Sequence, residues 1–511
     1  MTDRADSPGQ SDVAPALRRQ VRGSSLLLAG RLVAIVLNLA SHVALVRVLV
    51  PEDYGSLSFA LALTGLVANV NLMGLARAMS RLVPLFDAPG TRARLGGALA
   101  VAVGTIALLG AVLLTLGFAF DGRWQPLFAS NDTSARLLTL LLVLVPLTAV
   151  DAMLEVVAAA TAGARAVFFR RHLMTPLLRL GLVLLAGLLG WSVETLALGY
   201  VAAGAVGVAA YALILRRALR ERDVPRPGRA DLPLRSVWGY AAPMLVVDLA
   251  GVSILHLPAI ALERFHGSAA VAGLRAVLPL ATLVMVVMHS FRLLYVPLAT
   301  RTNEEQGLEE LSAVHWAAVR WIGILSFPVF AVAAFLPEQV VPLLFGARYA
   351  EAAPLASIMA LGYYLHAVLG VHALTLQALG RSRDLVWTAA AGIGASVAAN
   401  LILVPRYGAV GAAVACVLTL VAHDAASLVL VWRSGLLVGP GRAAARPFLW
   451  VAAASGALFA GVTLARPSAH IAVPAVGAAI LIAFARTRRS LELREWFPEL
   501  AGLPVVGRWI T

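Results

Sequence analysis

Charged and polar side chains inside long apolar runs are the residues that could do chemistry in this sequence. Arg31, Asn38 and His42 lie in the first such run, at spacings of seven and four residues, which place them on one face of a helix. Charge inside an apolar segment is costly and usually faces a cavity or a partner. Two interpretations stay open: the three residues line a polar stripe, or Arg31 extends its guanidinium to the nearest polar boundary.

Asp151 and Glu155 form the second group, four residues apart in another apolar run and therefore on one helix face. Two carboxylates this close in a medium of low dielectric constant rarely both ionise. This pattern is typical of a proton- or sodium-coupling site. The alternative is that each carboxylate pairs with a nearby arginine, such as Arg179, as a structural tie.

A third group joins two neighbouring runs. Asp248 and His256 are eight residues apart on one run, and His289 and Arg292 are three apart on the next. Asp248 has no cation close to it in sequence, so Arg292 is its expected partner. The pair would either line a cavity or bridge two helices structurally. Arg275 begins the same run as Arg292 and lies near the opposite end of it.

Two further groups of polar residues lie in apolar runs between residues 354 and 432. Asp424 follows His423 in one run, and Asn400 lies in the run before it, so Asp424 is another candidate for coupling. An earlier run combines aromatic rings with polar groups, which suits the faces of sugars, although Tyr364 fits core packing equally well. The residues of this run are Tyr363, Tyr364, His366, His372 and Gln377.

Motifs of catalysis are missing from the sequence. It contains no Lys, and therefore no phosphate-binding Gly-x-x-x-x-Gly-Lys loop, and neither Gly-x-Ser-x-Gly nor His-Glu-x-x-His occurs. Its single Cys416 and scattered histidines form no metal-ligand pattern. We therefore expect no enzyme, no metal site and no cofactor, apart from a possible H⁺ or Na⁺ as coupling ion.

These side chains must be positioned by membrane-spanning helices. Of the 511 residues, 60% are apolar and 13% are charged, whereas soluble proteins have about 25% charged residues. Because a bilayer core requires about 20 apolar helical residues, the sequence predicts an all-α, polytopic membrane protein with about 14 transmembrane helices. The expected spans lie near 24–46, 56–76, 95–118, 137–160, 173–190, 194–215, 236–260, 273–299, 317–337, 354–378, 386–404, 409–432, 447–465 and 469–486.

The distribution of arginine predicts the orientation. With the N-terminus inside, the segments on the inner side hold 29 arginines and those on the outer side hold 8. Because inner loops are enriched in basic residues, we expect both termini in the cytoplasm. The net charge of +14 thus reflects topology. It does not indicate nucleic-acid binding, because no soluble domain is left to carry a basic face.

An internal repeat predicts the organisation of the spans. At an offset of 217 residues, Phe128 pairs with Phe345, and Gly163 pairs with Gly380. Each copy holds six spans, an even number, so both copies insert in the same orientation, as in many secondary transporters. The predicted parts are a disordered cytoplasmic tail (1–23), an N-lobe (24–215), a cytoplasmic basic linker (216–235), a C-lobe (236–432), a C-terminal helix pair (447–486) and a cytoplasmic tail (487–511).

Several stretches resemble one family of membrane proteins. RVLVPEDYGSLSFAL, from Arg47 to Leu61, is similar to the first loop and second helix of the polysaccharide-transport (O-antigen and exopolysaccharide flippase) branch of the multidrug/oligosaccharidyl-lipid/polysaccharide flippase superfamily. LFGARYAEAAPL, YAAPMLVVDLAGVSILHLPAIAL and NLILVPRYGAVGAAVA resemble the turn before its tenth helix, its seventh helix and its eleventh–twelfth hairpin. The resemblance covers roughly residues 20–435, and the final helix pair matches fourteen-helix members.

The resemblance implies a flippase that moves a polyprenyl-pyrophosphate-linked oligosaccharide across the bacterial inner membrane by alternating access, for surface polysaccharide biosynthesis. Its implied partners are this lipid-linked glycan, membrane lipids, and a polysaccharide polymerase with chain-length machinery. Expected contacts with the anionic head group and the cavity are Arg31, Asn38, His42, His256, Arg275, Arg292, Tyr363 and His366. Expected coupling or gating residues are Asp151, Glu155, Asp248 and Asp424.

Three alternatives stay open. One is a cation-coupled multidrug or toxin extruder of the same superfamily, for which a net negative cavity is expected. Another is the lipid II flippase branch, although its own pattern of charged residues finds no clear match. The third is a membrane glycosyltransferase or polymerase, which the short loops between the spans disfavour.

Overall fold

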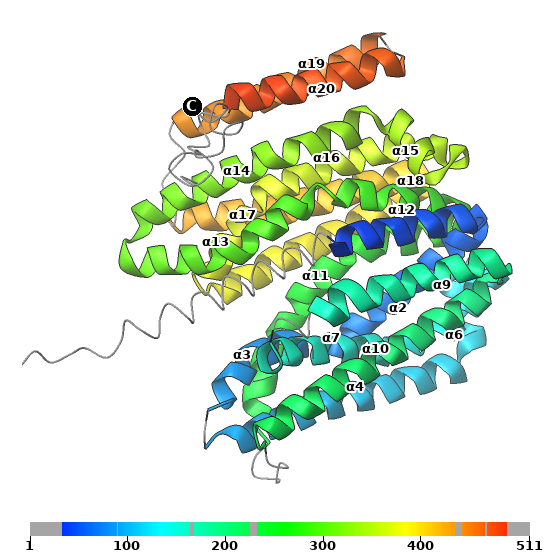
Figure 1. Ribbon diagram of the computed structural model, residues 1–511, viewed down its shortest axis with the longest axis vertical. Helices are drawn as coiled ribbons and strands as arrows, with labels where there is room; N and C mark the ends of the chain where they lie inside the picture. The colour runs from blue at the N-terminus through cyan, green and yellow to red at the C-terminus, as the bar shows by residue number, and fades with distance from the viewer. Residues whose placement is uncertain are drawn as a thin grey trace, which may run out of the picture. The chain divides into compact units, whose positions relative to one another are not determined.

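The computed structural model describes residues 33–88, 90–163, 168–224, 232–435, 442–465 and 468–487 (Figure 1). These residues are almost entirely helical, so the all-α prediction is confirmed. A first helix covers Val33–Val48. The following elements are α2 (Pro51–Leu72), α3 (Leu75–Phe86), α4 (Arg92–Ala119), α5 (Asp121–Phe128), α6 (Asp132–Leu141), α7 (Leu144–Thr161), the π-helix η1 (Phe168–Met174), α9 (Thr175–Leu189), α10 (Val193–Glu221), α11 (Leu234–His266), α12 (Ser268–Thr282), α13 (Met285–Glu305), α14 (Leu308–Phe335), α15 (Pro337–Phe345), the 3₁₀-helix η3 (Ala347–Ala352), α16 (Ala353–Leu369), α17 (Val371–Ala378), α18 (Ser382–Arg433), α19 (Arg442–Ala465) and α20 (Ala469–Thr487).

Ten helices in the described ranges are long and apolar enough to cross a membrane, or eleven when the bent pair α12–α13 counts as one span. Two shorter apolar helices cover Val33–Val48 and Phe448–Gly461. Within the described residues, the expected spans coincide with helices, although 386–404 and 409–432 share the kinked α18. The count of fourteen stays a prediction. The 47° bend between α12 and α13 follows Pro279, whose ring disrupts the helical hydrogen bonds around it.

The chain forms two compact units. The first contains the described residues within Met1–Leu49, Val67–Gln125 and Arg136–Leu245, and the second those within Val50–Leu66, Pro126–Ala135 and Val246–Thr511. Helices α2 and α11 therefore contribute residues to both. The lobes expected at 24–215 and 236–432 are defined by their movement during transport, which the two compact units do not test. The lobes stay a prediction.

Helix α7 is central to the first unit, where it packs against α3, α4 and α10. Its buried side chains recur at helical spacing, as in Val145, Ala149, Met153 and Val157, so one stripe of α7 is apolar core. The carboxylates of Asp151 and Glu155 lie on another face and are only half-buried. The same helix thus fixes the core of the unit and presents the two acids.

Helix α16 takes the corresponding place in the second unit, between α12, α14 and α18 (Figure 1). Small residues allow close approach: a Cβ on Gly362 would collide with the side chain of Val417 on α18. Tyr364 stacks on Phe330 at 4.5 Å and donates a hydrogen bond to the carbonyl of Gly323 at 2.9 Å. Tyr364 therefore has the packing role that its position in the sequence left open.

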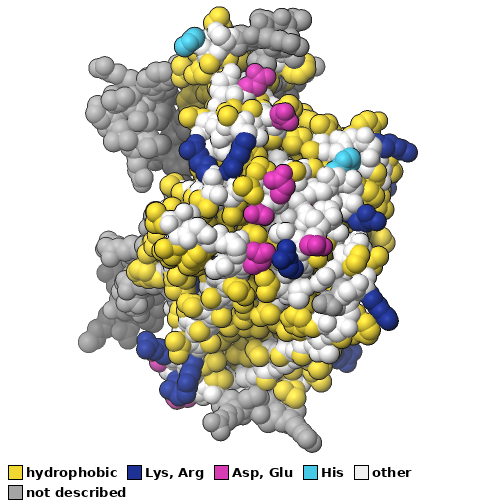
Figure 2. All heavy atoms as spheres, turned by 90° about the vertical axis from the view of Figure 1, so that its right-hand side faces the viewer, with side chains coloured by type: hydrophobic (Ala, Val, Ile, Leu, Met, Phe, Trp, Pro, Cys, Tyr) yellow, Lys and Arg dark blue, Asp and Glu magenta, His cyan; other side chains and the backbone are white. Residues whose placement is uncertain are grey.

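The surface of the helices carries large apolar side chains, as expected in lipid. Leu108, Leu188 and Trp432 are 71%, 82% and 76% exposed, values that would be costly in water over so many positions. Figure 2 shows one face on which hydrophobic side chains are widespread between scattered charged ones. Together with the spans, this surface makes the chain a multi-pass membrane protein.

Local sequence explains the short turn between α9 and α10. Gly190 ends α9 with φ at 62°, a left-handed conformation that glycine adopts without steric cost. Ser192 then caps α10, accepting a hydrogen bond from the backbone N–H of Thr195 at 3.3 Å. Before α9 the chain forms the π-helix η1, which carries Arg170 and Arg171 towards α7.

Candidate functional site

Arg275 and His256 come together inside the second unit. Arg275 lies on α12 and its Nη2 is 3.2 Å from Nδ1 of His256 on α11. Gly65 of α2 leaves room for the imidazole, because a Cβ there would lie 3.0 Å from Nε2 of His256. Both residues were predicted to contact the substrate, and the fold places them side by side although they come from different spans.

The surroundings of Arg275 contain no neutralising acid within the described residues. Tyr54, Tyr363 and Cys416 lie close enough to interact with its charge, and Nε of Arg275 is buried without a hydrogen-bond partner. The thiol of Cys416 is 4.0 Å from the hydroxyl of Tyr363. A half-buried guanidinium that lacks a carboxylate has unused capacity to bind an anion.

A second cluster centres on Asp424 of α18, whose side chain is completely buried. Nδ1 of His366 on α16 donates to its two carboxylate oxygens at 2.9 and 3.0 Å. His423 lies beside them, with its ring centre 6.1 Å from that of His366. Its Nδ1 is buried without a hydrogen-bond partner in the described part of the chain. A carboxylate bonded to an imidazole can exchange a proton with it.

Asp151 is held differently, in the first unit. Its carboxylate forms an ion pair with Arg170 of η1, whose guanidinium also donates to Thr175 at 2.9 Å and lies 4.4 Å from the ring centre of Tyr211. Gly207 provides the space, since a Cβ there would collide with the guanidinium. Arg170 therefore neutralises Asp151, while Thr175 and Tyr211 hold its guanidinium in place.

Glu155 also pairs with an arginine, Arg171, which is 57% exposed. The sequence suggested Arg179 as the partner of such acids, whereas the structure uses Arg170 and Arg171 from η1. The structural interpretation of Asp151 and Glu155 thus has direct geometric support. Their role in coupling stays a prediction.

The other predicted residues are more dispersed. Arg31 lies outside the described residues. In the helix Val33–Val48, Asn38 is exposed and His42 is half-buried. Arg292 on α13 donates to the side-chain oxygen of Gln377 at 3.2 Å, and its expected pairing with Asp248 stays a prediction.

One cluster was missed by reasoning from the sequence. Glu263, near the end of α11, is fully buried, and its Oε1 accepts hydrogen bonds from the hydroxyls of Ser134, Ser130 and Ser268 at 2.6, 2.7 and 3.0 Å. Ser56 of α2 donates to Ser268 at 2.9 Å. The only sequence signal is an acid just beyond the apolar run 236–260, because Ser56, Ser130 and Ser134 are more than 120 residues away in the chain.

Comparison with known proteins identifies relatives. Residues 20–302 match the family model described as polysaccharide biosynthesis protein. An uncharacterized membrane protein of Methanocaldococcus jannaschii is 27% identical over 188 residues, which are 36% of each chain. The chain thus spans about a third of the length of this curated relative.

Solved structures share the fold. The lipid II flippase MurJ, in an inward closed conformation, has a TM-score of 0.70 at 14% identity, over 91% of this chain and 99% of that one. An inward-facing multidrug resistance MATE transporter of the MOP superfamily has a TM-score of 0.64 at 15% identity, over 79% and 94%. An outward-facing MATE structure has a TM-score of 0.52 at 15% identity, over 81% and 95%.

Proposed function

The chain belongs to the polysaccharide biosynthesis protein family, and from that premise we propose that it is a flippase for a polyprenyl-pyrophosphate-linked oligosaccharide in the bacterial inner membrane. Its coarser class, a membrane flippase or transporter with the MOP-superfamily fold, follows from the family and the shared fold. The proposal adds the substrate, alternating access of two lobes, both termini in the cytoplasm and cooperation with a polysaccharide polymerase.

The environment of Arg275 is the observation that supports the proposed substrate. Such a lipid has a diphosphate between a polar glycan and a long apolar tail, so its carrier must offer a cation inside an apolar helix bundle. Arg275 is half-buried, held by His256 and free of any ion pair within the described residues. Two donors of a guanidinium match two oxygens of one phosphate.

The cluster of Asp424 and His366 supports ion coupling. Its carboxylate is completely buried and bonded to imidazole nitrogen, and buried ionisable groups inside membrane bundles commonly serve proton or ion pathways. We assign the coupling ion, H⁺ or Na⁺, to Asp424. Asp248 stays a further candidate for this role.

Translocation in vesicles tests the proposal. The full chain is reconstituted with a fluorescent polyprenyl-diphosphate oligosaccharide, and the appearance of the head group on the opposite leaflet is measured. Arg275→Ala should reduce the rate at least tenfold, whereas Arg264→Ala should not, because Arg264 is exposed near the end of α11. An Arg275→Ala variant as fast as the parent would overturn the assignment of Arg275.

The same vesicles separate the alternatives. A drug extruder of this superfamily would move amphipathic cations and leave the lipid-linked glycan in place. A lipid II flippase would move lipid II in preference to other lipid-linked saccharides. The shared fold is compatible with both functions, so translocation of a polysaccharide precursor in preference to cations and lipid II is the result that the proposal requires.

A further inference from the structure

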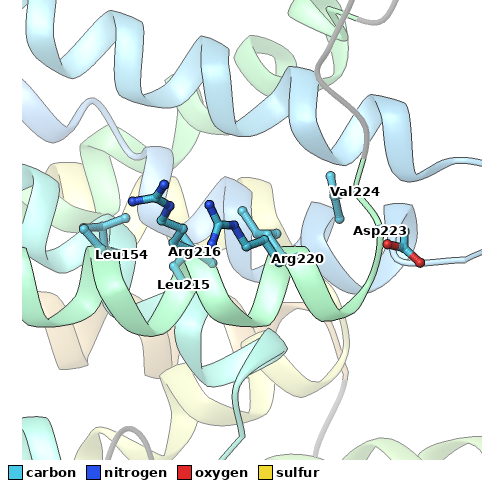
Figure 3. A pocket seen from close by; sticks show the side chains of 8 residues that line it. Leu154, Leu215, Arg216, Arg220, Asp223 and Val224 are labelled. Carbon is cyan, nitrogen blue, oxygen red and sulfur yellow. The ribbon is translucent and has the colours of Figure 1, made fainter.

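A hollow with a volume of about 540 Å³ lies between α7 and α10 of the first unit (Figure 3). Arg216 and Arg220 line it from consecutive turns of α10, and Figure 3 shows their guanidinium groups beside each other. Leu154, Leu215 and Val224 provide apolar walls, and Asp223 lies at one end. The hollow therefore combines two cationic side chains with an apolar lining.

These two arginines differ from their neighbour Arg222. Arg222 is tied to Asp87 by an ion pair of 3.3 Å, and its carbonyl accepts a hydrogen bond from Arg92 at 2.6 Å. Arg216 and Arg220 are exposed, and neither has an ion pair or a hydrogen bond within the described part of the chain. Like charges one turn apart repel each other, so an anion between them would relieve that repulsion.

We infer that this hollow binds the phosphate of an anionic membrane lipid, with the first part of an acyl chain against the leucines. The arginine distribution assigns this end of α10 to the cytoplasmic leaflet, which is rich in anionic lipids. The apolar wall favours a lipid over free phosphate. A lipid with two phosphates fits two guanidinium groups better than one with a single phosphate. This site does not depend on the proposed transport function.

Lipid binding by the purified full chain tests this inference. Cardiolipin, phosphatidylglycerol and phosphatidylcholine are added in turn, and retained lipid is counted by native mass spectrometry. The pocket variant Arg216→Gln/Arg220→Gln should lose about ten- to thirtyfold in affinity for cardiolipin. The matched control Arg217→Gln/Arg235→Gln removes equal charge from exposed arginines outside the lining and should bind normally.

Three results would overturn the inference. The first is an equal loss of affinity in both double variants, which would indicate only general surface charge. The others are no loss in either variant, and binding of soluble inorganic pyrophosphate as tight as that of cardiolipin. Preference for cardiolipin that disappears only in the pocket variant supports it.

Glu263 carries a second, independent inference, which rests on the proposed function. Among the residues that the structure describes, its buried carboxylate has no cationic partner and Oε2 has no hydrogen-bond partner. A buried charge that is not paired costs several kcal/mol. The hydroxyls of Ser130 and Ser134 come from a segment more than 120 residues away in sequence. Their hydrogen bonds offset the cost of burying the carboxylate only while the two segments stay together.

Close backbone contact accompanies these hydrogen bonds. A Cβ on Gly55 would collide with the carbonyl of Ser268, so α2 and α12 meet at a point that admits only glycine. The starts of α2, α6 and α12 and the end of α11 lie at the bundle end that the arginine distribution assigns to the outer side. We propose that Glu263 with Ser56, Ser130, Ser134 and Ser268 forms an outer latch, which must separate when the flippase opens outward.

A reversible cross-link tests the latch. The hydroxyl oxygens of Ser56 and Ser268 are 2.9 Å apart, so cysteines at these positions lie within reach of a disulfide. In a Cys416→Ala background, oxidised Ser56→Cys/Ser268→Cys should lose translocation at least tenfold and regain it on reduction. Each single cysteine variant should have the same rate oxidised and reduced, because it cannot form the cross-link.

Full translocation by the cross-linked protein would overturn the latch while leaving the proposed function intact, because the segments would then be a static tie. If the parent without cross-link moves no lipid-linked glycan, the proposed function itself fails. Blocked translocation that reduction reverses supports the latch.

Discussion

The two units bind the carboxylates on their helices in different ways. In the first unit, Asp151 and Glu155 are each paired with an arginine of η1. In the second, Asp424 is bonded to His366 and Glu263 to serine hydroxyls. Arginine stays charged at any accessible pH, so its pairs are permanent. Imidazoles and hydroxyls allow the charge of the acid or the number of its bonds to change.

From this difference we expect the ion pairs of the first unit to stabilise the fold and the acids of the second unit to take part in transport. Asp151, Arg170 and Tyr211 form one fixed tie, as the glycine opposite the guanidinium shows. The second unit holds the groups that can exchange a proton or a partner, together with Arg275. We therefore expect substitutions in the first unit to change stability and those in the second to change transport.

The largest effect should come from Asp151→Ala. It leaves the guanidinium of Arg170, only 8% exposed, without its counter-charge, which typically costs about 3–5 kcal/mol. The free energy of unfolding in detergent measures this loss. The double variant Asp151→Ala/Arg170→Met removes the cation as well and should recover much of it. A single variant as stable as the parent would show that the tie is not structural.

Asp424→Asn should have the next largest effect, on transport instead of stability. The amide oxygen still accepts a hydrogen bond from His366, so the unfolding free energy should change by about 1 kcal/mol. Loss of the ionisable carboxyl should lower the translocation rate at least tenfold. His366→Gln is the companion variant. If Asp424→Asn unfolds the protein or leaves the rate unchanged, the contrast between the units is wrong.

Glu263→Gln sharpens the comparison from the side of the latch. The amide oxygen can accept the same serine hydroxyls, while the charge that has no partner disappears. The closed latch should become more favourable, so the translocation rate should fall several-fold with unfolding free energy equal to or above that of the parent. Faster translocation in this variant would contradict the role of the charge in opening.

The smallest effect is expected for Glu155→Gln. Its partner Arg171 is 57% exposed, and ion pairs with such access to water contribute about 0–1 kcal/mol. Stability and translocation should both stay close to those of the parent. A tenfold loss of translocation would instead revive the coupling role predicted for Glu155.

The sequence predicted the helices more completely than the contacts between them. Apolar length and helical spacing predicted the spans and the shared face of Asp151 and Glu155. Spacing along one helix carries no information about a neighbouring helix, so the partner Arg170 was not predicted. The same reason explains Glu263, because Ser130 and Ser134 lie more than 120 residues away from it in the chain. His256 and Arg275 were each predicted as polar residues in apolar runs, and only the fold joined them.

The π-helix Phe168–Met174 has a consequence for how this chain tolerates changes in length. A π-helix bonds each N–H five residues back, where an α-helix bonds four back, so it behaves as a single inserted residue. Deleting one residue from it would turn Arg170 and Arg171 by about 100° relative to α9 and separate them from their acids. Insertions and deletions here should thus be rarer among relatives than substitutions, and an alignment would show a segment of fixed length.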